Sequence, residues 1–461
     1  MAAFLAAFMV FMVLHYLEDV RWFRWDAGDY WNLAELHRLL DFPAEIRGYF
    51  YPMLLAPARY LFDLRPGYGY LPYRVVSSLA YAYMLAVALP GFYTRTFGGR
   101  LSFWRRLLVP VLLSVIFPGT IVYPLSDLPA VCLMLGAITC AMQSVTRGQP
   151  LARYGLLLLC GILAYGAYNT RTIFLFPAVA LLVGVPWVLY RGQDAKLRSA
   201  AVLIFLVGAT IASVPQVLIN ARHHGTWNPA VITTDDGRSL FAQQLLWGMV
   251  VQRYETTLDG SAQSPAVVYP DHAGERLVQS LHLPRDFSIA DYFGLLLRHP
   301  VDFMGIYGRH LINGLDVRDG DIYSRVQSPG RNGKALFNFL VLFLGLLVIA
   351  IALLERRANE AIAGAWFWAL VALLPVGMIV PGAIETRFFL PLDLALYSAI
   401  AFGTDGCRVA VVLKRHGLVV LLAFGFSASM FFAISMATMA DYEYGSQHVY
   451  RLLMGARGGE V

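Results

Sequence analysis

Eleven apolar stretches, each about as long as a membrane is thick, constrain the fold of this chain more than any other feature of its sequence. A helix needs roughly 20 mostly apolar residues to cross the hydrocarbon layer of a bilayer. The stretches lie at about residues 2–18, 72–92, 107–123, 127–143, 154–168, 172–190, 199–219, 335–354, 363–380, 387–403 and 417–437. We therefore expect an all-α, multi-pass membrane protein with about eleven transmembrane helices.

The composition favours a membrane location. Hydrophobic residues make up 58% of the chain and charged residues only 14%, whereas soluble proteins carry about 25% charged residues. Too few polar side chains are present to cover a soluble body of this size. The 14% of aromatic residues fits a long membrane–water boundary, where amphipathic rings settle.

The distribution of basic residues predicts which loops face the cytoplasm. Basic residues favour the cytoplasmic side of a membrane. With the N-terminus inside, every cytoplasmic loop is basic: Arg95/Arg100/Arg105/Arg106, Arg147/Arg153, Arg191/Lys196/Arg198, Arg356/Arg357 and Arg408/Lys414/Arg415. These loops account for much of the net charge of +6, so we expect no nucleic-acid partner. We expect a multi-pass protein of the plasma (inner) membrane.

The same alternation divides the chain into three parts. Residues 1–220 form an N-terminal transmembrane module, 221–334 an extracytoplasmic segment, and 335–461 a C-terminal transmembrane module that ends in a short polar tail. The middle segment alternates short apolar runs with Gly, Pro and Asp, so we expect a small folded cap there. In the first outer loop, the apolar spacing of 29–40 and the short apolar run 48–55 predict helices that lie flat at the membrane interface. The alternative is a plain amphipathic connector, which we favour for residues 33–41.

Two carboxylates in the first outer loop are the main candidates for chemistry. Asp26 and Asp29 stand three residues apart within Arg24–Trp31, among aromatic residues, and at this spacing they can share one helical face. A carboxylate near a bilayer surface loses solvation, which suits it to act as a general base or a metal ligand. The alternative is a helix cap, in which Asp26 or Asp29 begins the helix that follows.

Further candidates lie in two outer turns between helices. Asp127 follows Ser126 at the start of an expected helix, where an ordinary helix cap is the alternative. Arg171, beside Asn169 and Thr170, is an arginine on the side that basic residues normally avoid. Its guanidinium can either bind phosphate oxygens bidentately or form a structural salt bridge to a loop carboxylate.

Two pairs of residues in the second half of the chain complete the candidates. Glu385 and Arg387 flank Thr386 in an outer turn. Charges at a membrane boundary are candidates for function, so Arg387 is a second candidate for phosphate binding, with Glu385 as a neighbour in the site. An internal ion pair between them is the alternative. Arg309 and His310 place basic groups in the outer segment, where they either contact lipid headgroups or lie on the plain surface.

No sequence motif points to a cofactor. The four cysteines lie in or beside apolar stretches without metal-ligand spacing. HExxH, Walker-type, GxSxG and dinucleotide-binding patterns are missing from the sequence. We therefore assign no cofactor from the sequence, and a divalent metal stays an open alternative that no motif supports.

Taken in order, several short motifs resemble the GT-C superfamily of membrane glycosyltransferases, which includes the protein O-mannosyltransferases and the lipid A aminoarabinose transferases. The resemblance covers roughly residues 1–220 and 335–403 and rests on the order and the shared outer side of the motifs. The motifs are the acidic stretch Arg24–Tyr30, the segment Gly48–Pro52 with Tyr51, the turn Tyr123–Ala130, the turn at Arg171, and Glu385–Pro391.

The resemblance implies a transferase of the cell envelope that uses a polyprenyl-phosphate-linked sugar donor. It would move the sugar, with inversion, to a hydroxyl of a glycan, lipid or protein acceptor on the extracytoplasmic face. Asp26 would be the general base, Asp127 a second carboxylate of the site, and Arg171 and Arg387 the ligands of the donor phosphate. Protein mannosyltransferases often carry adjacent Asp-Glu in this loop, whereas here Asp26 and Asp29 are spaced, so the choice of base stays open.

Two other functions fit parts of the sequence. A flippase or other transporter of lipid-linked glycans often carries charges inside its spanning helices or paired helix breaks, whereas here charge gathers on the outer side. A polymerase of surface polysaccharide would share the membrane, the lipid carrier and the outer-face chemistry. The sequence therefore separates the transferase from a transporter better than from a polymerase.

Overall fold

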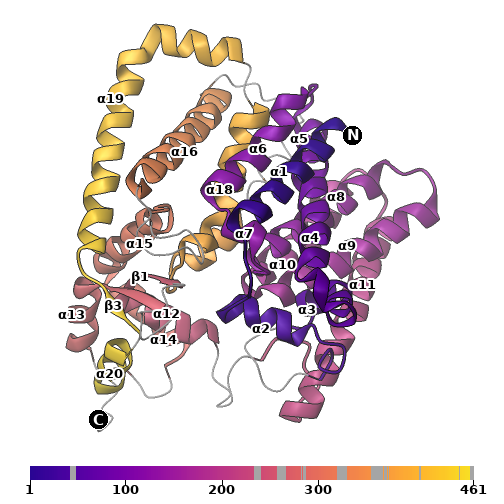
Figure 1. Cartoon of the computed structure of the whole chain (residues 1–461), viewed down its shortest axis with the longest axis horizontal. Coiled ribbons are helices and arrows are strands. Elements are labelled where there is room, and N and C mark those ends of the chain that lie inside the picture. Colours follow the sequence, from indigo (N-terminus) through magenta and orange to yellow (C-terminus); the bar gives the residue numbers. More distant parts are fainter. Residues whose placement is uncertain are drawn as a thin grey trace. The chain divides into compact units, whose positions relative to one another are not determined.

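The computed structural model describes residues 1–41, 48–232, 240–256, 266–281, 283, 287–318, 330–354, 367, 371, 373–403, 406–445 and 447–456. The chain forms two compact units. One comprises Met1–Asp235 and Ala352–Pro375, and the other Asp236–Ile351 and Val376–Val461. Both units consist mainly of helices (Figure 1).

The first unit is a bundle of helices joined by short connections. In chain order its elements are α1 (Ala2–Glu18), α2 (Trp25–Leu33), α3 (Phe50–Leu64), η1 (Pro66–Tyr68), α4 (Leu71–Tyr83), η2 (Met84–Ala88), α5 (Leu89–Phe97), α6 (Phe103–Ile116), α7 (Gly119–Val122), α8 (Asp127–Thr146), α9 (Pro150–Thr170), η3 (Thr172–Phe174), α10 (Leu175–Gly184), η4 (Val185–Leu189) and α11 (Ala195–His224). The most extensive packing is that of α9 against α8 and α11.

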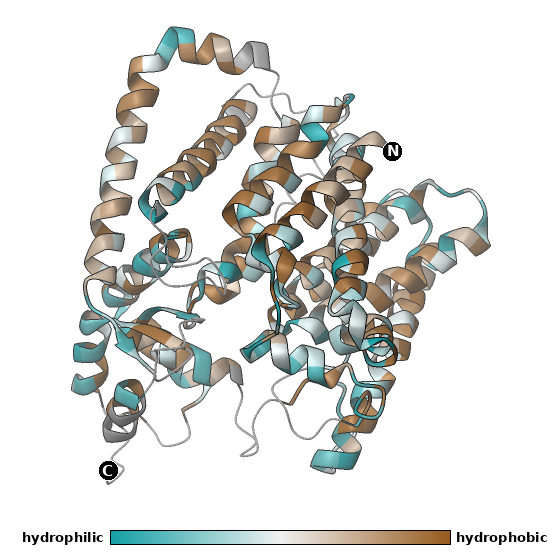
Figure 2. Ribbon diagram, in the orientation of Figure 1, coloured by the Kyte–Doolittle hydropathy of each residue, from teal (hydrophilic) through white to brown (hydrophobic). Residues whose placement is uncertain are grey.

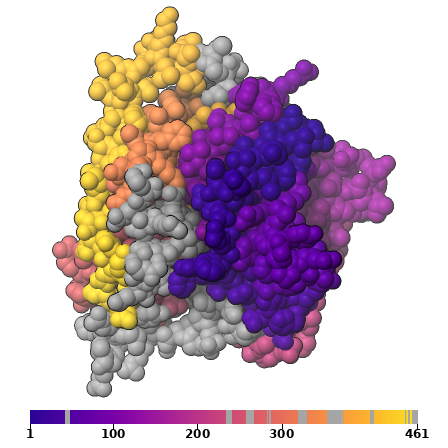
Figure 3. Space-filling model, in the orientation of Figure 1, coloured from indigo at the N-terminus to yellow at the C-terminus, as the bar shows by residue number. Residues whose placement is uncertain are grey.

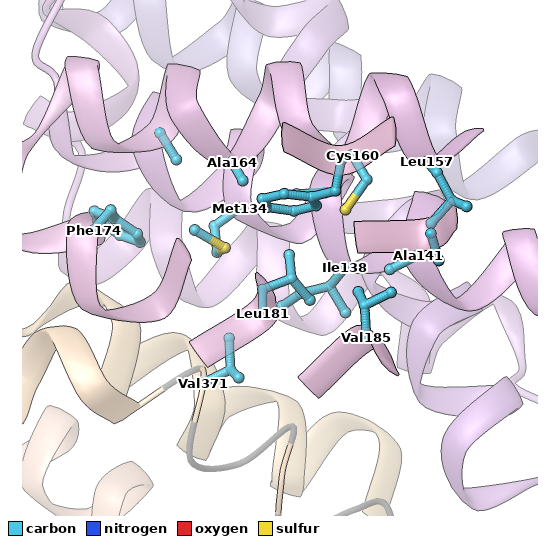
Figure 4. Packing of buried hydrophobic residues seen from close by; sticks show 14 of the residues in the cluster. Met134, Ile138, Ala141, Leu157, Cys160, Ala164, Phe174, Leu181, Val185 and Val371 are labelled. Atoms are coloured by element: carbon cyan, nitrogen blue, oxygen red, sulfur yellow. The ribbon is translucent and has the colours of Figure 1, made fainter. Parts of the chain in front are cut away.

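An apolar core lies between α8, α9, α10 and α11. Met134 of α8, Cys160 of α9 and Leu181 of α10 meet in it (Figure 4). α9 and α11 approach closely at Gly161 and Gly208, where a Cβ on either glycine would collide with a backbone carbonyl of the other helix. Small residues at helix contacts are typical of membrane proteins, in which close packing holds the helices together.

Among the described residues, seven helical segments are long and apolar enough to cross a membrane: Leu71–Phe97, Asp127–Thr146, Pro150–Thr170, Thr172–Leu189, Ala195–His224, Arg331–Ala352 and Val409–Met439. Figure 2 shows apolar residues along most of the length of these helices. The prediction of a mainly helical, multi-pass membrane protein is therefore confirmed.

The other four predicted spans are shorter helices or are only partly described by the structure. α1 has 17 residues, and α18 (Leu390–Gly403) has 14. The stretch 107–123 is divided between α6, which ends at Ile116, and the short α7, because Pro118 disfavours helical geometry in the residue before it. Of the stretch 363–380, the structure describes residues 367, 371 and 373–380. The count of about eleven spans stays a prediction.

The second unit combines helices with a small sheet. Its elements are α12 (Leu240–Val250), β1 (Val251–Thr256), β2 (Ala266–Pro270), α13 (His272–Ser280), α14 (Ile289–Arg298), α15 (Pro300–Gly314), α16 (Arg331–Leu354), η5 (Thr386–Phe389), α18, α19 (Gly406–Met439), β3 (Glu443–Tyr444) and α20 (Gln447–Ala456). Within the described residues, the sheet has the antiparallel order β1-β2-β3. α19 bends at His416, where the backbone leaves helical geometry (Figure 1).

The apolar core of the second unit joins distant parts of the sequence. α12, α13, α14 and α15 supply most of it, with Met249, Val278 and Phe303 fully buried. Val449 and Leu453 of α20 pack into the same core, and β3 pairs with β2. The end of the chain, expected as a polar tail, is therefore folded together with the segment that was expected to be a separate cap.

Candidate functional site

The acidic residues of the first outer loop lie within the helix α2, and neither of them caps it. The helix begins at Trp25, Arg24 occupies the N-cap position, and Asp26 lies in the first turn. The cap interpretation of Asp26 and Asp29 is therefore wrong. A carboxylate in the first turn interacts favourably with the positive end of the helix dipole. Asp26 therefore stabilises a helix that begins at Trp25, earlier than the start at Asp29 that the apolar spacing predicts.

The backbone immediately before Asp26 is strained. Trp25 has a φ of 49°, and Asp19, which follows the last residue of α1, has a φ of 39°. A positive φ is uncommon outside glycine and costs about 1–3 kcal/mol. The connection between α1 and α2 is therefore held in place by its surroundings, and strained backbone of this kind gathers at functional sites.

Asp26 and Asp29 differ in their exposure. Asp26 is half-buried and Asp29 is exposed, while Tyr30 and Trp31 of the same helix are buried. This buried face packs on α3, where the Tyr30 ring lies 5.1 Å from the ring of Tyr51. A half-buried carboxylate loses part of its solvation but stays accessible to a substrate. These surroundings suit Asp26 to the role of a general base better than Asp29.

The start of α3 is anchored to the end of α9, next to Arg171. The backbone N–H of Phe50 donates a hydrogen bond to Oδ1 of Asn169 at 2.8 Å. Gly48 lies so close to Asn169 that a Cβ there would collide with it, and the Phe50 ring covers Gly166 of α9. A glycine at position 48 is therefore required, because any side chain would push the loop away from α9.

Asn169 is itself held by a chain of buried amides. Its Nδ2 donates to Oε1 of Gln216 at 2.9 Å, and Nε2 of Gln216 donates to Oδ1 of Asn220 at 3.0 Å. Nδ2 of Asn220 donates to the carbonyl oxygens of Asn228 and Ala230 at 2.5 and 2.7 Å. Because buried polar groups need hydrogen-bond partners, this chain fixes the amide of Asn169 in one orientation.

Arg171 and Asp127 form an ion pair that is largely shielded from solvent. α9 ends just before Arg171 and α8 begins at Asp127, so the contact of the two helices brings these residues together. Asp127 is the first residue of α8 and bonds to Arg171, so its interpretation as an ordinary helix cap is wrong. The pair is the salt bridge that was predicted as the alternative to phosphate binding by Arg171.

Five predicted site residues thus lie on joined segments of the first unit: Asp26, Asp29, Tyr51, Asp127 and Arg171. A second link runs through the rings of Phe23, which precedes α2, and Tyr123, which precedes α8, with centroids 6.3 Å apart. In Figure 3, α1 to α3 form a continuous indigo-to-violet surface on the visible face. The first unit therefore brings the acidic loop together with the turns that contain Asp127 and Arg171.

Glu385 and Arg387 belong to the second unit, where they are buried and paired with each other. This is the internal ion pair that was predicted as the alternative to phosphate binding. Hydrogen bonds join the turn to β1: Oγ1 of Thr256 donates to Glu385 at 2.8 Å, and the backbone N–H of Thr386 donates to Glu255 at 3.0 Å. The turn is therefore fixed on both sides of Thr386.

The Glu385–Arg387 pair lies beside a buried charge network that the sequence did not predict. Arg253 bonds to Glu255 at 2.8 Å and lies 3.9 Å from Asp316. Asp316 pairs with Arg318 at 2.7 Å, and Ser435 of α19 bonds to both. One signal in the sequence is the spacing of Arg253 and Glu255, which puts both on one face of a strand. Finding the network from this spacing requires knowing that this face is buried.

Arg309 and His310 are both held by partners within the second unit. Nε and Nη2 of Arg309 bond to Asp271 at 2.8 and 3.0 Å. His310 is fully buried, with ring nitrogens 2.6 Å from the carbonyl oxygen of Val380 and 3.0 Å from that of Val251. The prediction that His310 contacts headgroups or lies on the surface is wrong, because His310 is on the inner face of α15.

Among the described residues, no group of three or more His, Cys, Asp or Glu side chains is placed to hold a metal ion. Comparisons of the chain with protein families, with curated proteins and with solved structures find no match. The function must therefore be inferred from the residues and contacts of this chain.

Proposed function

We propose that the protein is a glycosyltransferase that moves a sugar from a polyprenyl-phosphate-linked donor to an acceptor hydroxyl on the extracytoplasmic face, with inversion. One observation carries the proposal: the half-buried Asp26 and the shielded Asp127–Arg171 pair lie on joined segments of one membrane-spanning unit. Such a transfer needs a base for the acceptor hydroxyl and positive charge for the departing phosphate. The resemblance of the motifs to GT-C enzymes supports the same reaction.

Asp26 is proposed as the general base. It takes the proton of the acceptor hydroxyl while the oxygen attacks the sugar from the side opposite the phosphate, which inverts the anomeric centre. The buried Tyr30 and Trp31 hold α2 in place beneath it. Asp29, one helical turn further on, is the alternative base and serves as the internal comparison.

Arg171 is proposed to bind the donor phosphate. A guanidinium has five N–H donors in a fixed fork, so the same group can bond to the carboxylate of Asp127 and to a phosphate. In this arrangement Asp127 orients the guanidinium. We favour Arg171 over Arg387 as the phosphate ligand, because Arg387 is buried in the second unit and pairs with Glu385.

The first experiment measures sugar transfer by the purified protein in proteoliposomes, with decaprenyl-phosphate-linked glucose, mannose and arabinose as donors. Asp26→Asn removes the base at constant size, so we expect the rate to fall by about 10²–10⁴-fold. Asp29→Asn, on the same helix, is the matched control and should keep most of the activity. Loss of transfer activity in Asp29→Asn alone would assign the base to Asp29. Full activity in both variants would contradict the proposed site.

A comparison of envelope glycans from cells with and without the gene identifies the sugar and the acceptor. Loss of one sugar unit from otherwise complete glycans is expected for a transferase. Loss of an entire polymer would instead favour a polymerase. Accumulation of a complete lipid-linked glycan on the cytoplasmic side would favour a transporter.

A further inference from the structure

The exposed face of α14 is apolar, which is the reverse of a helix in water. Ile289, Phe293 and Leu297 recur every four residues on this face, while Tyr292 and Leu295 point into the core of the second unit. Leu297 is 82% exposed. A helix at a water-exposed surface carries polar residues opposite its buried face, whereas α14 carries Ile289, Phe293 and Leu297 there.

α15 continues the same pattern. Val301 and Met304 are 79% and 72% exposed, and Leu311 is exposed further along the same side. Phe303 and Ile306 fill the buried side. We define the α14–α15 apolar face as Ile289, Phe293, Leu297, Val301, Met304 and Leu311. Large contiguous apolar patches on a protein surface mark contacts with a partner or a membrane.

The end of α15 reaches the level of two membrane-spanning helices of the same unit. Nδ2 of Asn313 donates to Oγ1 of Thr438 at 3.0 Å, near the end of α19. The carbonyl oxygen of Leu315 accepts from Nδ2 of Asn338 at 3.4 Å. Asn338 lies seven residues after Arg331, the first residue of α16, which corresponds to about 10 Å along the helix. The end of α15 therefore lies beside the last turn of α19 and beside α16, about 10 Å along that helix from its first residue.

From this position we propose that the α14–α15 apolar face lies in the lipid bilayer, in the leaflet that contains the start of α16 and the end of α19. The face belongs to the unit that contains Arg331–Ala352 and Val409–Met439, two helical segments long and apolar enough to cross a membrane. Arg298, His299 and Asp302 lie at the corner between α14 and α15, where headgroups and water can solvate them. The bilayer therefore covers the six apolar side chains and leaves the polar corner at the interface. The inference does not depend on the reaction that the protein catalyses.

The test measures what surrounds individual side chains of the full-length protein in vesicles of phosphatidylcholine and phosphatidylglycerol. Nitroxide labels are attached through Leu297→Cys and Met304→Cys in a chain whose four native cysteines are replaced by alanine. Arg298→Cys and Asp302→Cys, on the same two helices, are the matched controls. Electron paramagnetic resonance then compares collisions with oxygen, which concentrates in lipid, and with a water-soluble nickel complex.

We expect the ratio of oxygen to nickel collisions to be severalfold higher at positions 297 and 304 than at 298 and 302. Equal access of the nickel complex to all four positions would show that water covers the face. Exclusion of both reagents from 297 and 304 would show that protein covers it. Either result would overturn the proposal.

If the cysteine-free chain does not fold, the native chain provides an equivalent measurement. Leu297→Trp adds a fluorophore on the apolar face, and Arg298→Trp adds one beside it as the control. Brominated phosphatidylcholine should quench the added fluorescence at 297 severalfold more strongly than at 298. Equal quenching at the two positions would contradict the inference.

Discussion

Removing the guanidinium of Arg171 leaves the carboxylate of Asp127 buried without its main opposite charge. Breaking a buried ion pair on one side typically costs about 3–5 kcal/mol, while removing both partners costs much less. We expect Arg171→Ala to lower the thermal stability of the detergent-solubilised protein strongly. The double variant Asp127→Ala/Arg171→Ala should recover much of the loss.

The double variant also separates the structural role of Arg171 from its proposed role in donor binding. Since it lacks the buried charge, it should fold well enough for kinetic measurement. Phosphate binding by Arg171 predicts a raised KM for the polyprenyl-phosphate donor and an unchanged KM for the acceptor. An unchanged donor KM would leave Arg171 with the structural role alone.

His272 gives the second unit a dependence on pH. Its ring nitrogens lie 2.8 Å from Glu275 and 2.6 Å from Asp441, and hydrogen bonds to these two carboxylates raise its pKa above the ordinary value of 6.5. Protonated His272 therefore stabilises the folded state fully below pH 6.5, and this contribution is lost as the pH rises through the raised pKa.

His272→Asn tests this dependence. We expect the variant to lower the melting temperature at pH 6 and to have no effect at pH 9. The loss should be under about 1 kcal/mol, because the side chain is largely exposed and screened by solvent. An equal loss at both pH values would mean that the imidazole acts through packing and not through its charge.

Among the elements, α9 and α11 depend on the closeness of their backbones. Gly161→Ala would place a methyl group against the backbone carbonyl of Phe205, so the helices would have to separate. We expect a loss of about 1–3 kcal/mol, as for other overpacked cores. Gly155→Ala is the matched control on the same helix, because a Cβ there meets open space. In thermal unfolding, Gly161→Ala should lower the melting temperature, and Gly155→Ala should leave it unchanged or raise it.

The long helices could be predicted from the sequence, and the short elements could not. A run of about 20 apolar residues has few alternatives to a spanning helix, so the stretch 127–143 is close to the observed α8 (Asp127–Thr146). β1 and β2 have six and five residues, and runs of that length do not show a reliable period. The sheet depends on pairing between distant segments, which local pattern does not reveal.

At the level of the whole molecule, the sequence predicted which residues are unusual but not what surrounds them. The predicted topology puts Asp127 and Arg171 on one side of the membrane, while their pairing across 44 residues depends on the packing of α8 and α9. For His310 and the charge network of Arg253, Glu255 and Asp316, the sequence shows only that titratable residues lie outside the apolar stretches. Their burial is a property of the folded chain, since segments far apart in sequence must cover them.

The buried charge network also sets an order of events during synthesis of the protein. Asp316 and Ser435 are 119 residues apart in the chain. Ribosomes add about 5–20 residues per second, so Ser435 is synthesised roughly ten seconds after Asp316. Until α19 has emerged, Asp316 and Arg318 can pair with each other but lack their hydrogen bonds to Ser435. A nascent chain that stops before residue 435 therefore lacks part of the cover that the completed chain gives to these charges.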